Sequence, residues 1–233
     1  MLQLLENKAM KTVLITGTSR GIGAALVKAL EAEGHSVLAL SRSYPKMYKE
    51  GRTTYIPFDI TQEADLQQLV AYLQRENIRL DIVVSNAGKL INAPFAAISA
   101  KDLQAVYEVN VLGVFRLIQC LLPLLQAQAH IITISSMGGV QGAMKFAGLS
   151  AYTSSKAALI ALTELLAEEY KDTQWHFNCL ALGAVQTEML SEAFADYKAP
   201  VTAKEMAQYI KDFALHQYPY FNGKLLQVAS TTP

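Results

Sequence analysis

The stretch Thr12-Val-Leu-Ile-Thr-Gly-Thr-Ser-Arg-Gly-Ile-Gly23 decides the expected fold. Each of its first five residues is apolar or β-branched, as in a buried strand, and a turn containing three glycines follows them directly. A helical pattern then continues to about Glu33, where Gly34 supplies a C-terminal stop. A strand, a glycine-rich turn and a helix in this order begin a βαβ unit, so we expect a parallel sheet.

The rest of the chain repeats this alternation of short β-rich runs and longer helical stretches. Helices are expected from about 62, over 100–125 and over 151–170, and strands over 12–16, 36–40, 55–58, 81–85, 131–135, 177–182 and 224–228. The pattern predicts an α/β protein with a doubly wound, mostly parallel seven-stranded sheet flanked by helices on both faces. Residues 1–233 are expected to form a single domain, with 1–11 as a candidate flexible N-terminal extension.

Composition restricts the kind of partner. Hydrophobic residues make up 52% of the chain, and 20 Lys and Arg residues balance 20 Asp and Glu residues. This balance provides no field that attracts nucleic acid or an anionic membrane. Two distant cysteines and four scattered histidines show no metal-ligand spacing, so no metal site is expected. The N-terminus lacks a secretory signal, and Arg116 and Pro123 interrupt the apolar stretch 109–134. We therefore expect a soluble cytoplasmic protein.

The glycine-rich turn after the first strand is a candidate phosphate-binding site. Gly17, Gly21 and Gly23 allow the backbone to turn sharply and to approach a pyrophosphate. The exposed N–H groups of the following helix would then bind the anion. Glycine-rich loops also serve as plain turns, but the placement between a strand and a helix at the start of the chain favours a dinucleotide.

The spacing Thr-Gly-x-x-x-Gly-Ile-Gly resembles the short-chain dehydrogenase/reductase family rather than the G-x-G-x-x-G fingerprint. Further segments similar to that family follow in its order as far as Thr187. The resemblance implies a Rossmann fold, a nicotinamide cofactor and an oxidoreductase activity. It also implies a homodimer or homotetramer, for which the alanine-rich helix 151–170 and the apolar helix before it are candidate contact surfaces. The sequence alone also allows a monomer.

Charge after the second strand indicates which dinucleotide is bound. An NAD site places a carboxylate there to bond the ribose hydroxyls. This chain has Ser41 followed by Arg42, and Arg20 lies within the glycine-rich turn. Two guanidinium groups without an acid suit a 2′-phosphate, so we expect NADP(H). The alternative is that both arginines are solvated surface charges.

The family resemblance assigns the remaining cofactor contacts. Asp59 and Ile60 match an adenine-contacting pair, although Asp59 also suits a turn or helix cap. Asn86-Ala87-Gly88 matches a motif at the nicotinamide ribose, and the alternative for Asn86 is a role in joining neighbouring strands. Leu182 replaces the usual proline before Gly183. The expected cofactor-binding residues are Gly17, Ser19, Arg20, Gly21, Ile22, Gly23, Ser41, Arg42, Asp59, Ile60, Asn86, Ala87, Gly88, Tyr152, Lys156, Gly183, Val185 and Thr187.

Tyr152 and Lys156 form the candidate catalytic pair. Residues four apart share a helix face, so the phenol and the ammonium would point into one site. A nearby positive charge favours phenolate and brings the pKa of the phenol toward the working range. By resemblance, Lys156 also bonds the nicotinamide ribose, Ser136 holds the reacting carbonyl oxygen and Asn110 holds a water in a proton relay. Ser135 competes with Ser136, and a structural helix-bend role is the alternative for Asn110.

These residues predict an NADPH-dependent enzyme that transfers hydride between nicotinamide and a small-molecule carbonyl or alcohol substrate, with Tyr152 as general acid or base. Alternatives on the same fold are a non-catalytic dinucleotide-binding sensor or scaffold, and an epimerase or dehydratase. The stretch 187–200 is expected to cover the substrate. Its candidate contact residues, and those of the facing wall, are Met189, Leu190, Phe194, Tyr197, Leu90, Ile91, Phe95, Val140, Lys145 and Phe146.

Overall fold

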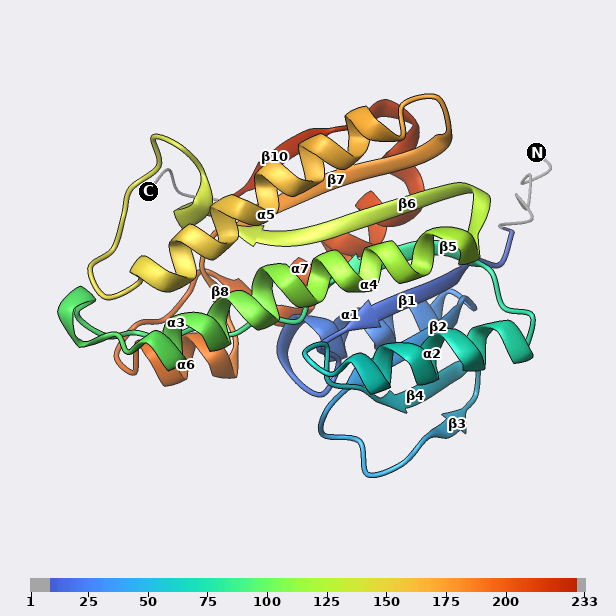
Figure 1. Ribbon diagram of the computed structural model, residues 1–233, viewed down its shortest axis with the longest axis horizontal. Helices are drawn as coiled ribbons and strands as arrows, with labels where there is room; N and C mark the ends of the chain where they lie inside the picture. The colour runs from blue at the N-terminus through green and yellow to red at the C-terminus, as the bar shows by residue number, and fades with distance from the viewer. Residues whose placement is uncertain (1–8, 230–233) are drawn as a thin grey trace, which may run out of the picture.

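The computed structural model describes residues 9–229 and contains an eight-stranded sheet flanked by helices (Figure 1). The strand order is β10-β7-β6-β5-β1-β2-β4-β3, and every pair is parallel except β3 with β4. The strands are β1 Thr12–Thr16, β2 Ser36–Ser41, β3 Tyr48–Glu50, β4 Thr53–Pro57, β5 Leu80–Ser85, β6 Leu125–Ser136, β7 Gln174–Leu182 and β10 Lys224–Val228. The predicted fold class is confirmed, and the short antiparallel β3 at the edge is an eighth strand that the sequence did not predict.

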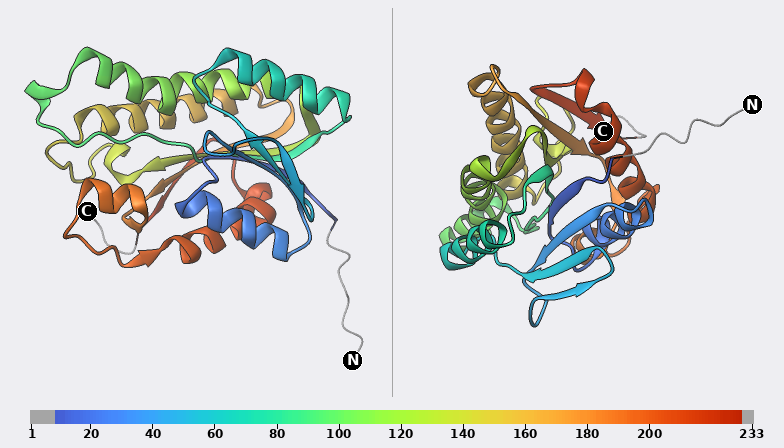
Figure 2. Two further views of the ribbon diagram at one scale, coloured as in Figure 1. Left: turned by 90° about the horizontal axis from the view of Figure 1, so that it is seen from below. Right: turned by 90° about the vertical axis from the view of Figure 1, so that its right-hand side faces the viewer.

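Side-chain alternation along the strands explains why helices cover both faces of the sheet (Figure 2). In β1, Leu14 points into one apolar cluster, whereas Val13 and Ile15 point into the other. The first cluster lies under α2 Glu63–Arg75, α4 Gly113–Leu121 and α5 Ser150–Glu169. The second lies under α1 Gly21–Ala32 and α7 Ala203–Asp212.

The strand order reverses at β1, which has β5 on one side and β2 on the other. In such sheets, ligands bind in the crevice at the carboxyl ends of the strands around this switch point. The glycine-rich turn after β1 and the segment that begins at Asn86 after β5 therefore emerge side by side. A small second sheet, β8 Val185–Gln186 with β9 Val201–Thr202, and the helix α6 Glu188–Ala193 lie at the same end.

The long helix expected over 100–125 is interrupted. It consists of α3 Ala100–Tyr107, a π-helical turn Glu108–Leu112, α4 and a short 3₁₀ turn. Gly113 allows α4 to lie against the loop after β4, since a Cβ there would be 2.8 Å from the carbonyl oxygen of Ile60. By length and composition alone this stretch is apolar enough to cross a membrane. In the fold it packs on the sheet through a buried stripe that includes Val106, Leu117 and Leu121.

The ends of the chain add two details. Residues 1–8 of the expected N-terminal extension lie outside the described residues. Lys11 is part of the fold, because its ammonium pairs with Asp81 at 3.0 Å and its backbone N–H donates to His35. The strand expected over 131–135 is longer, since β6 begins at Leu125 and pairs with β7 from Gln128 to Ser136.

Candidate active site

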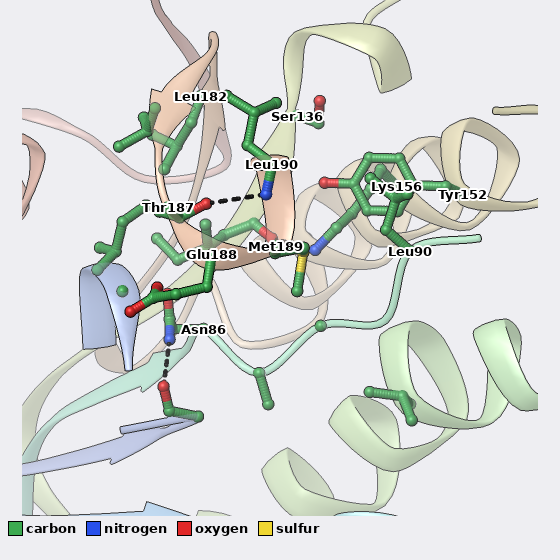
Figure 3. Close-up of a pocket in the computed structure, with 18 of the residues that line it drawn as sticks. Asn86, Leu90, Ser136, Tyr152, Lys156, Leu182, Thr187, Glu188, Met189 and Leu190 are labelled. Carbon is green, nitrogen blue, oxygen red and sulfur yellow. Dashed lines mark hydrogen bonds between the residues drawn. The ribbon is translucent and has the colours of Figure 1, made fainter. Parts of the chain in front are cut away.

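A cavity of about 840 Å³ opens at the carboxyl ends of the central strands (Figure 3). Its walls come from the glycine-rich turn, the ends of β2, β4, β5 and β6, the first turn of α5 and the segment 182–190. All of the predicted cofactor and catalytic residues line it except Gly23 and Asn110. The structure therefore brings segments from most of the chain into one site.

The glycine-rich turn has the shape that close approach of a phosphate group requires. Gly17 and Gly21 have φ angles of +73° and +58°, in the region that favours glycine. Gly23 lies beneath the turn rather than in the cavity wall, and a Cβ there would lie 2.2 Å from the carbonyl oxygen of Gly17. No side chain caps the first turn of α1, and that turn contains no acidic residue. These features fit a dinucleotide pyrophosphate at the N-terminus of α1.

Asn86 joins the two central strands. Its Nδ2 donates to the carbonyl oxygens of Thr16 at 3.0 Å and Gly17 at 3.1 Å. In return, the Thr16 hydroxyl accepts the backbone N–H groups of Asn86 and Ala87. The hydrogen bonds of the Asn86 amide thus fit the alternative role of joining neighbouring strands, and the residue also lines the cavity.

The two arginines expected at the 2′-phosphate have different surroundings. Arg42 follows β2, is exposed and makes no ion pair within residues 9–229. Arg20 forms a two-pronged ion pair with Glu192 on α6. The hydrogen bond with Glu192 raises the pKa of Arg20, and the reciprocal bond lowers the pKa of Glu192. Arg20 therefore connects the glycine-rich turn to the segment that covers the cavity.

A tyrosine that sequence analysis missed supports the turn that carries Arg42. The Tyr44 hydroxyl lies 2.9 Å from that of Thr18, which donates to the carbonyl oxygen of Leu40. The Tyr44 ring packs edge-on against Tyr55 with centroids 5.3 Å apart. These contacts bind the segment after β2 to the glycine-rich turn. No periodic pattern marks Tyr44, and its setting depends on the β3–β4 hairpin that was not expected.

Tyr152 and Lys156 lie one turn apart on α5 and face the same cavity (Figure 3). The ammonium lies 5.7 Å from the centroid of the Tyr152 ring and donates to the carbonyl oxygen of Ile134 at 2.8 Å. Burial lowers the pKa of Lys156 to about 8. Burial also raises the pKa of Tyr152, against a hydrogen bond with Ser136 that lowers it. The expected lowering of the phenol pKa is therefore not seen, and Tyr152 is protonated at neutral pH and can donate its proton.

The two adjacent serines have different partners. The Ser135 side chain is buried and donates to the backbone carbonyl of Lys156 at 2.8 Å, which fixes α5 against β6. Ser136 is half-buried, and its hydroxyl accepts the N–H of Gly138 at 3.3 Å. The Ser136 hydroxyl also forms the hydrogen bond that lowers the pKa of Tyr152. Ser136 is therefore better placed than Ser135 to contact a reacting oxygen.

Asn110 is fully buried in the π-helical turn and does not line the cavity. Its Oδ1 accepts the N–H of Lys89 at 2.7 Å, and its Nδ2 donates to the carbonyl oxygen of Lys89 and the hydroxyl of Ser155, each at 2.9 Å. These hydrogen bonds fit the structural alternative for Asn110, because they tie the loop after β5 to α5 beside Lys156. Its role in a proton relay stays a prediction.

The segment expected to cover the substrate does border the cavity. Met189, Leu190, Phe194 and Tyr197 line it, as do Leu90 and Phe146 on the facing wall. Thr187, which was expected to contact the cofactor, lines the cavity and also caps α6 by accepting the N–H of Leu190. The predicted pocket residues that do not line the cavity are Ile91, Phe95, Val140 and Lys145. Lining residues that were missed include Met137, Leu149, Thr153 and Glu188.

Comparison with known proteins agrees with this geometry. The family model described as short chain dehydrogenase matches residues 11–198. An L-fucose dehydrogenase from Mus musculus is 35% identical over 207 residues, covering 85% of this chain and 75% of that protein. The ketoacyl reductase HetN from Nostoc sp. is 33% identical over 190 residues, covering 77% of this chain and 65% of HetN. The chain thus spans just under two thirds of HetN.

Solved structures show the same architecture. A short-chain dehydrogenase/reductase from Serratia marcescens is 28% identical with a TM-score of 0.81, covering 94% of this chain and 95% of that one. A 4-hydroxyisoleucine dehydrogenase complexed with NADH and succinate is 21% identical with a TM-score of 0.84, covering 94% and 97%. At this identity the second likeness concerns the fold alone.

Burial of the Lys156 ammonium should lower the stability of the folded protein. Lowering its pKa from 10.5 to about 8 costs the folded state about 3 kcal/mol while the ammonium stays protonated. Lys156→Met removes this cost and loses one hydrogen bond, so the variant should be about 1–2 kcal/mol more stable at pH 7. From pH 8 to 10.5 the folded wild type releases the proton before the unfolded chain does, so wild-type stability should rise by about 1.4 kcal/mol per pH unit. The difference between the two proteins should close near about pH 9 and reverse by about pH 10. Urea unfolding at pH 7, 8, 9 and 10 measures this.

Lys211→Met is the matched control. Lys211 is also a buried lysine, but hydrogen bonds to Glu33 and Asp212 outweigh its burial and raise its pKa. Its replacement leaves those carboxylates without their cation and should lower stability at pH 7. If Lys156→Met were less stable than wild type at pH 7, burial of the ammonium would not destabilise the folded protein, and the prediction would be wrong.

Proposed function

The chain belongs to the short-chain dehydrogenase family of oxidoreductases, and on this premise we propose that it is an NADP(H)-dependent enzyme interconverting a carbonyl compound and its alcohol. The observation that carries the proposal is the grouping of Ser136, Tyr152 and Lys156 in one cavity with the glycine-rich turn. A site that only senses a dinucleotide does not require a buried phenol and ammonium beside the cofactor position.

The residues of this chain that would hold the cofactor follow from the cavity wall. The glycine-rich turn and the N-terminus of α1 would bind the pyrophosphate through backbone N–H groups. Arg42 would pair with the 2′-phosphate, because the β2 end carries Ser41 where NAD enzymes have a carboxylate. The 4-hydroxyisoleucine dehydrogenase neighbour contains NADH, so the proposal of NADP(H) rests on these two residues. When bound, the nicotinamide supplies or accepts the hydride.

The protein's own groups carry the proton. In the reductive direction the protonated Tyr152 donates to the carbonyl oxygen, and the Ser136 hydroxyl donates a hydrogen bond to the same oxygen. The Lys156 ammonium, held beside the Tyr152 ring by the Ile134 carbonyl oxygen, stabilises the phenolate that remains. Positioned proton transfer of this kind contributes roughly 10² to 10⁴-fold in rate, which is about 3 to 5 kcal/mol.

Cofactor preference tests the role of Arg42. Wild type should bind NADPH at least ~10-fold more tightly than NADH, since a charge-assisted hydrogen bond contributes about 1.5–3 kcal/mol. Arg42→Ala should lose this preference while its affinity for NADH stays the same. Calorimetric titration of both cofactors measures the ratio, and Arg75→Ala, an exposed arginine outside the cavity, is the control. Tighter binding of NADH by wild type would contradict the proposal.

Removal of the phenol oxygen separates an enzyme from a sensor. Tyr152→Phe should lower NADPH-dependent carbonyl reduction by about 10² to 10⁴-fold and leave the dissociation constant for NADPH within ~3-fold of wild type. Tyr209→Phe, a partly exposed tyrosine on α7 away from the cavity, should leave both unchanged. Cofactor consumption that persists in Tyr152→Phe would assign the proton to another group.

We further propose that the protein forms a homodimer or homotetramer through the outer face of α4 and α5. These helices lie together on one side of the sheet (Figure 1), and they expose Phe115 at 49% and Leu165 at 61%. Apolar side chains at such positions are characteristic of contact surfaces. Sedimentation velocity at micromolar concentration should show a dimer or tetramer that Leu165→Glu dissociates, and a wild-type monomer would overturn this.

A further inference from the structure

The part of the cavity beyond the catalytic groups has an apolar wall. Leu90, Met189 and Leu190 are grouped around Tyr152 and Lys156 (Figure 3). Phe146, Leu149 and Phe194 continue the lining. These side chains come from the loop after β5, the segment before α5 and the α6 region, so three separate parts of the chain supply the same kind of surface.

The charged side chains of the cavity are concentrated at the cofactor end. Arg20 and Arg42 belong to the glycine-rich turn and the β2 end, and Lys156 is bonded to the Ile134 carbonyl oxygen. Glu188 also lies beside the glycine-rich turn, since its Oε2 is 3.5 Å from the position that a Cβ of Gly21 would occupy. Among the described lining residues, Lys156 is the charged side chain beside the apolar wall, and its ammonium is already hydrogen-bonded to the Ile134 carbonyl oxygen. An anionic substrate group would therefore find no free counterion there, and a buried charge needs a partner.

Few hydrogen-bonding side chains remain for a polar substrate. Ser136 and Tyr152 are engaged by the reacting oxygen in the proposed mechanism. Among the described lining residues beside the apolar wall, Thr153 and Tyr197 are the further side chains with a hydroxyl group, whereas the other polar side chains belong to the cofactor end or are engaged by the backbone. A sugar presents several hydroxyl groups, and each one desolvated without a partner weakens binding. Two aromatic side chains, Phe146 at 53% and Tyr197 at 48% exposure, stand where a bulky apolar group would cover them.

We propose, building on the reductase function above, that the substrate is an uncharged ketone or aldehyde carrying a bulky apolar group, and not a sugar or a carboxylate. Hydride from the nicotinamide forms the new C–H bond as the C=O π bond breaks, and Tyr152 supplies the proton to the oxygen. The carbonyl is reduced to an alcohol and the cofactor is oxidised. The proposed substrate differs from the one in the name of the mouse relative, L-fucose dehydrogenase.

The test compares four compounds that differ in charge and polarity. NADPH-dependent reduction is measured with 4-phenyl-2-butanone, ethyl acetoacetate and acetoacetate, and NADP⁺-dependent oxidation is measured with L-fucose. The ester and the acid differ mainly by one charge, so kcat/KM for the ester should exceed that for the acid by at least ~10-fold. The phenyl ketone should give the highest kcat/KM, and L-fucose should give less than about 1% of that value.

Variants locate the effect in the apolar wall. Phe146→Ala should lower kcat/KM for 4-phenyl-2-butanone by about 10-fold and change that for acetone by less than about 2-fold, because only the larger substrate contacts the ring. Phe95→Ala is the matched control, since this phenylalanine is 82% exposed and does not line the cavity. Both replaced rings are exposed, so melting temperatures should stay near that of wild type.

The outcomes distinguish the substrate class from the underlying function. A higher kcat/KM for acetoacetate or L-fucose than for the phenyl ketone overturns the substrate class and leaves the oxidoreductase function in place. An equal loss of kcat/KM for 4-phenyl-2-butanone and acetone in Phe146→Ala has the same meaning. Absence of turnover with all four compounds while NADPH binds overturns both.

Discussion

The amide of Asn86 holds together the part of the molecule on which the cavity depends. At the switch point of the sheet, the chain leaves β1 and β5 side by side, and their carboxyl ends must be kept at a fixed separation. Asn86 does this by donating to the carbonyl oxygens of Thr16 and Gly17, while the Thr16 hydroxyl accepts two N–H groups in return. Gly23 can then lie against the Gly17 carbonyl, and the N-terminus of α1 points at the site. Backbone groups, rather than long side chains, thus shape the phosphate end of the cavity.

Much of this architecture could be predicted from local signals. The alternation of apolar runs and helical stretches predicts the parallel sheet, because strands buried on both faces have continuous apolar sequences. The glycine spacing and the Tyr152–Lys156 spacing identify residues that the fold brings into one cavity. The edge strand β3 was missed because its three residues are all exposed and carry no apolar pattern. The break in the helix at Glu108–Leu112 was anticipated only as the helix-bend alternative for Asn110, since it follows from the packing of Gly113 and Asn110 on distant segments.

The remaining differences arise from contacts between segments far apart in sequence. Arg20 and Glu192 are separated by 172 positions, and Tyr44 reaches Thr18 across 26. Spacing within a helix shows that Lys156 can act on Tyr152, but it does not show that burial raises the pKa of the phenol. Likewise, the apolar character of Asn110's neighbours indicates that its amide needs partners, and only the folded chain shows that Lys89 and Ser155 are those partners.

The ion pair between Arg20 and Glu192 joins α6 to the glycine-rich turn, and a hydrogen bond from the Asn92 amide to the Ala193 carbonyl oxygen joins it to the loop after β5. Both side chains of the ion pair are at least half exposed, so water and dissolved ions compete for them, and such pairs contribute roughly 0–1 kcal/mol. At physiological ionic strength the Debye length is about 8 Å, which weakens the attraction once the two groups separate. The ion pair therefore adds little to the free energy that keeps α6 in place. Local opening of this six-residue helix would cost less free energy than opening of the sheet, against which Lys156 is buried.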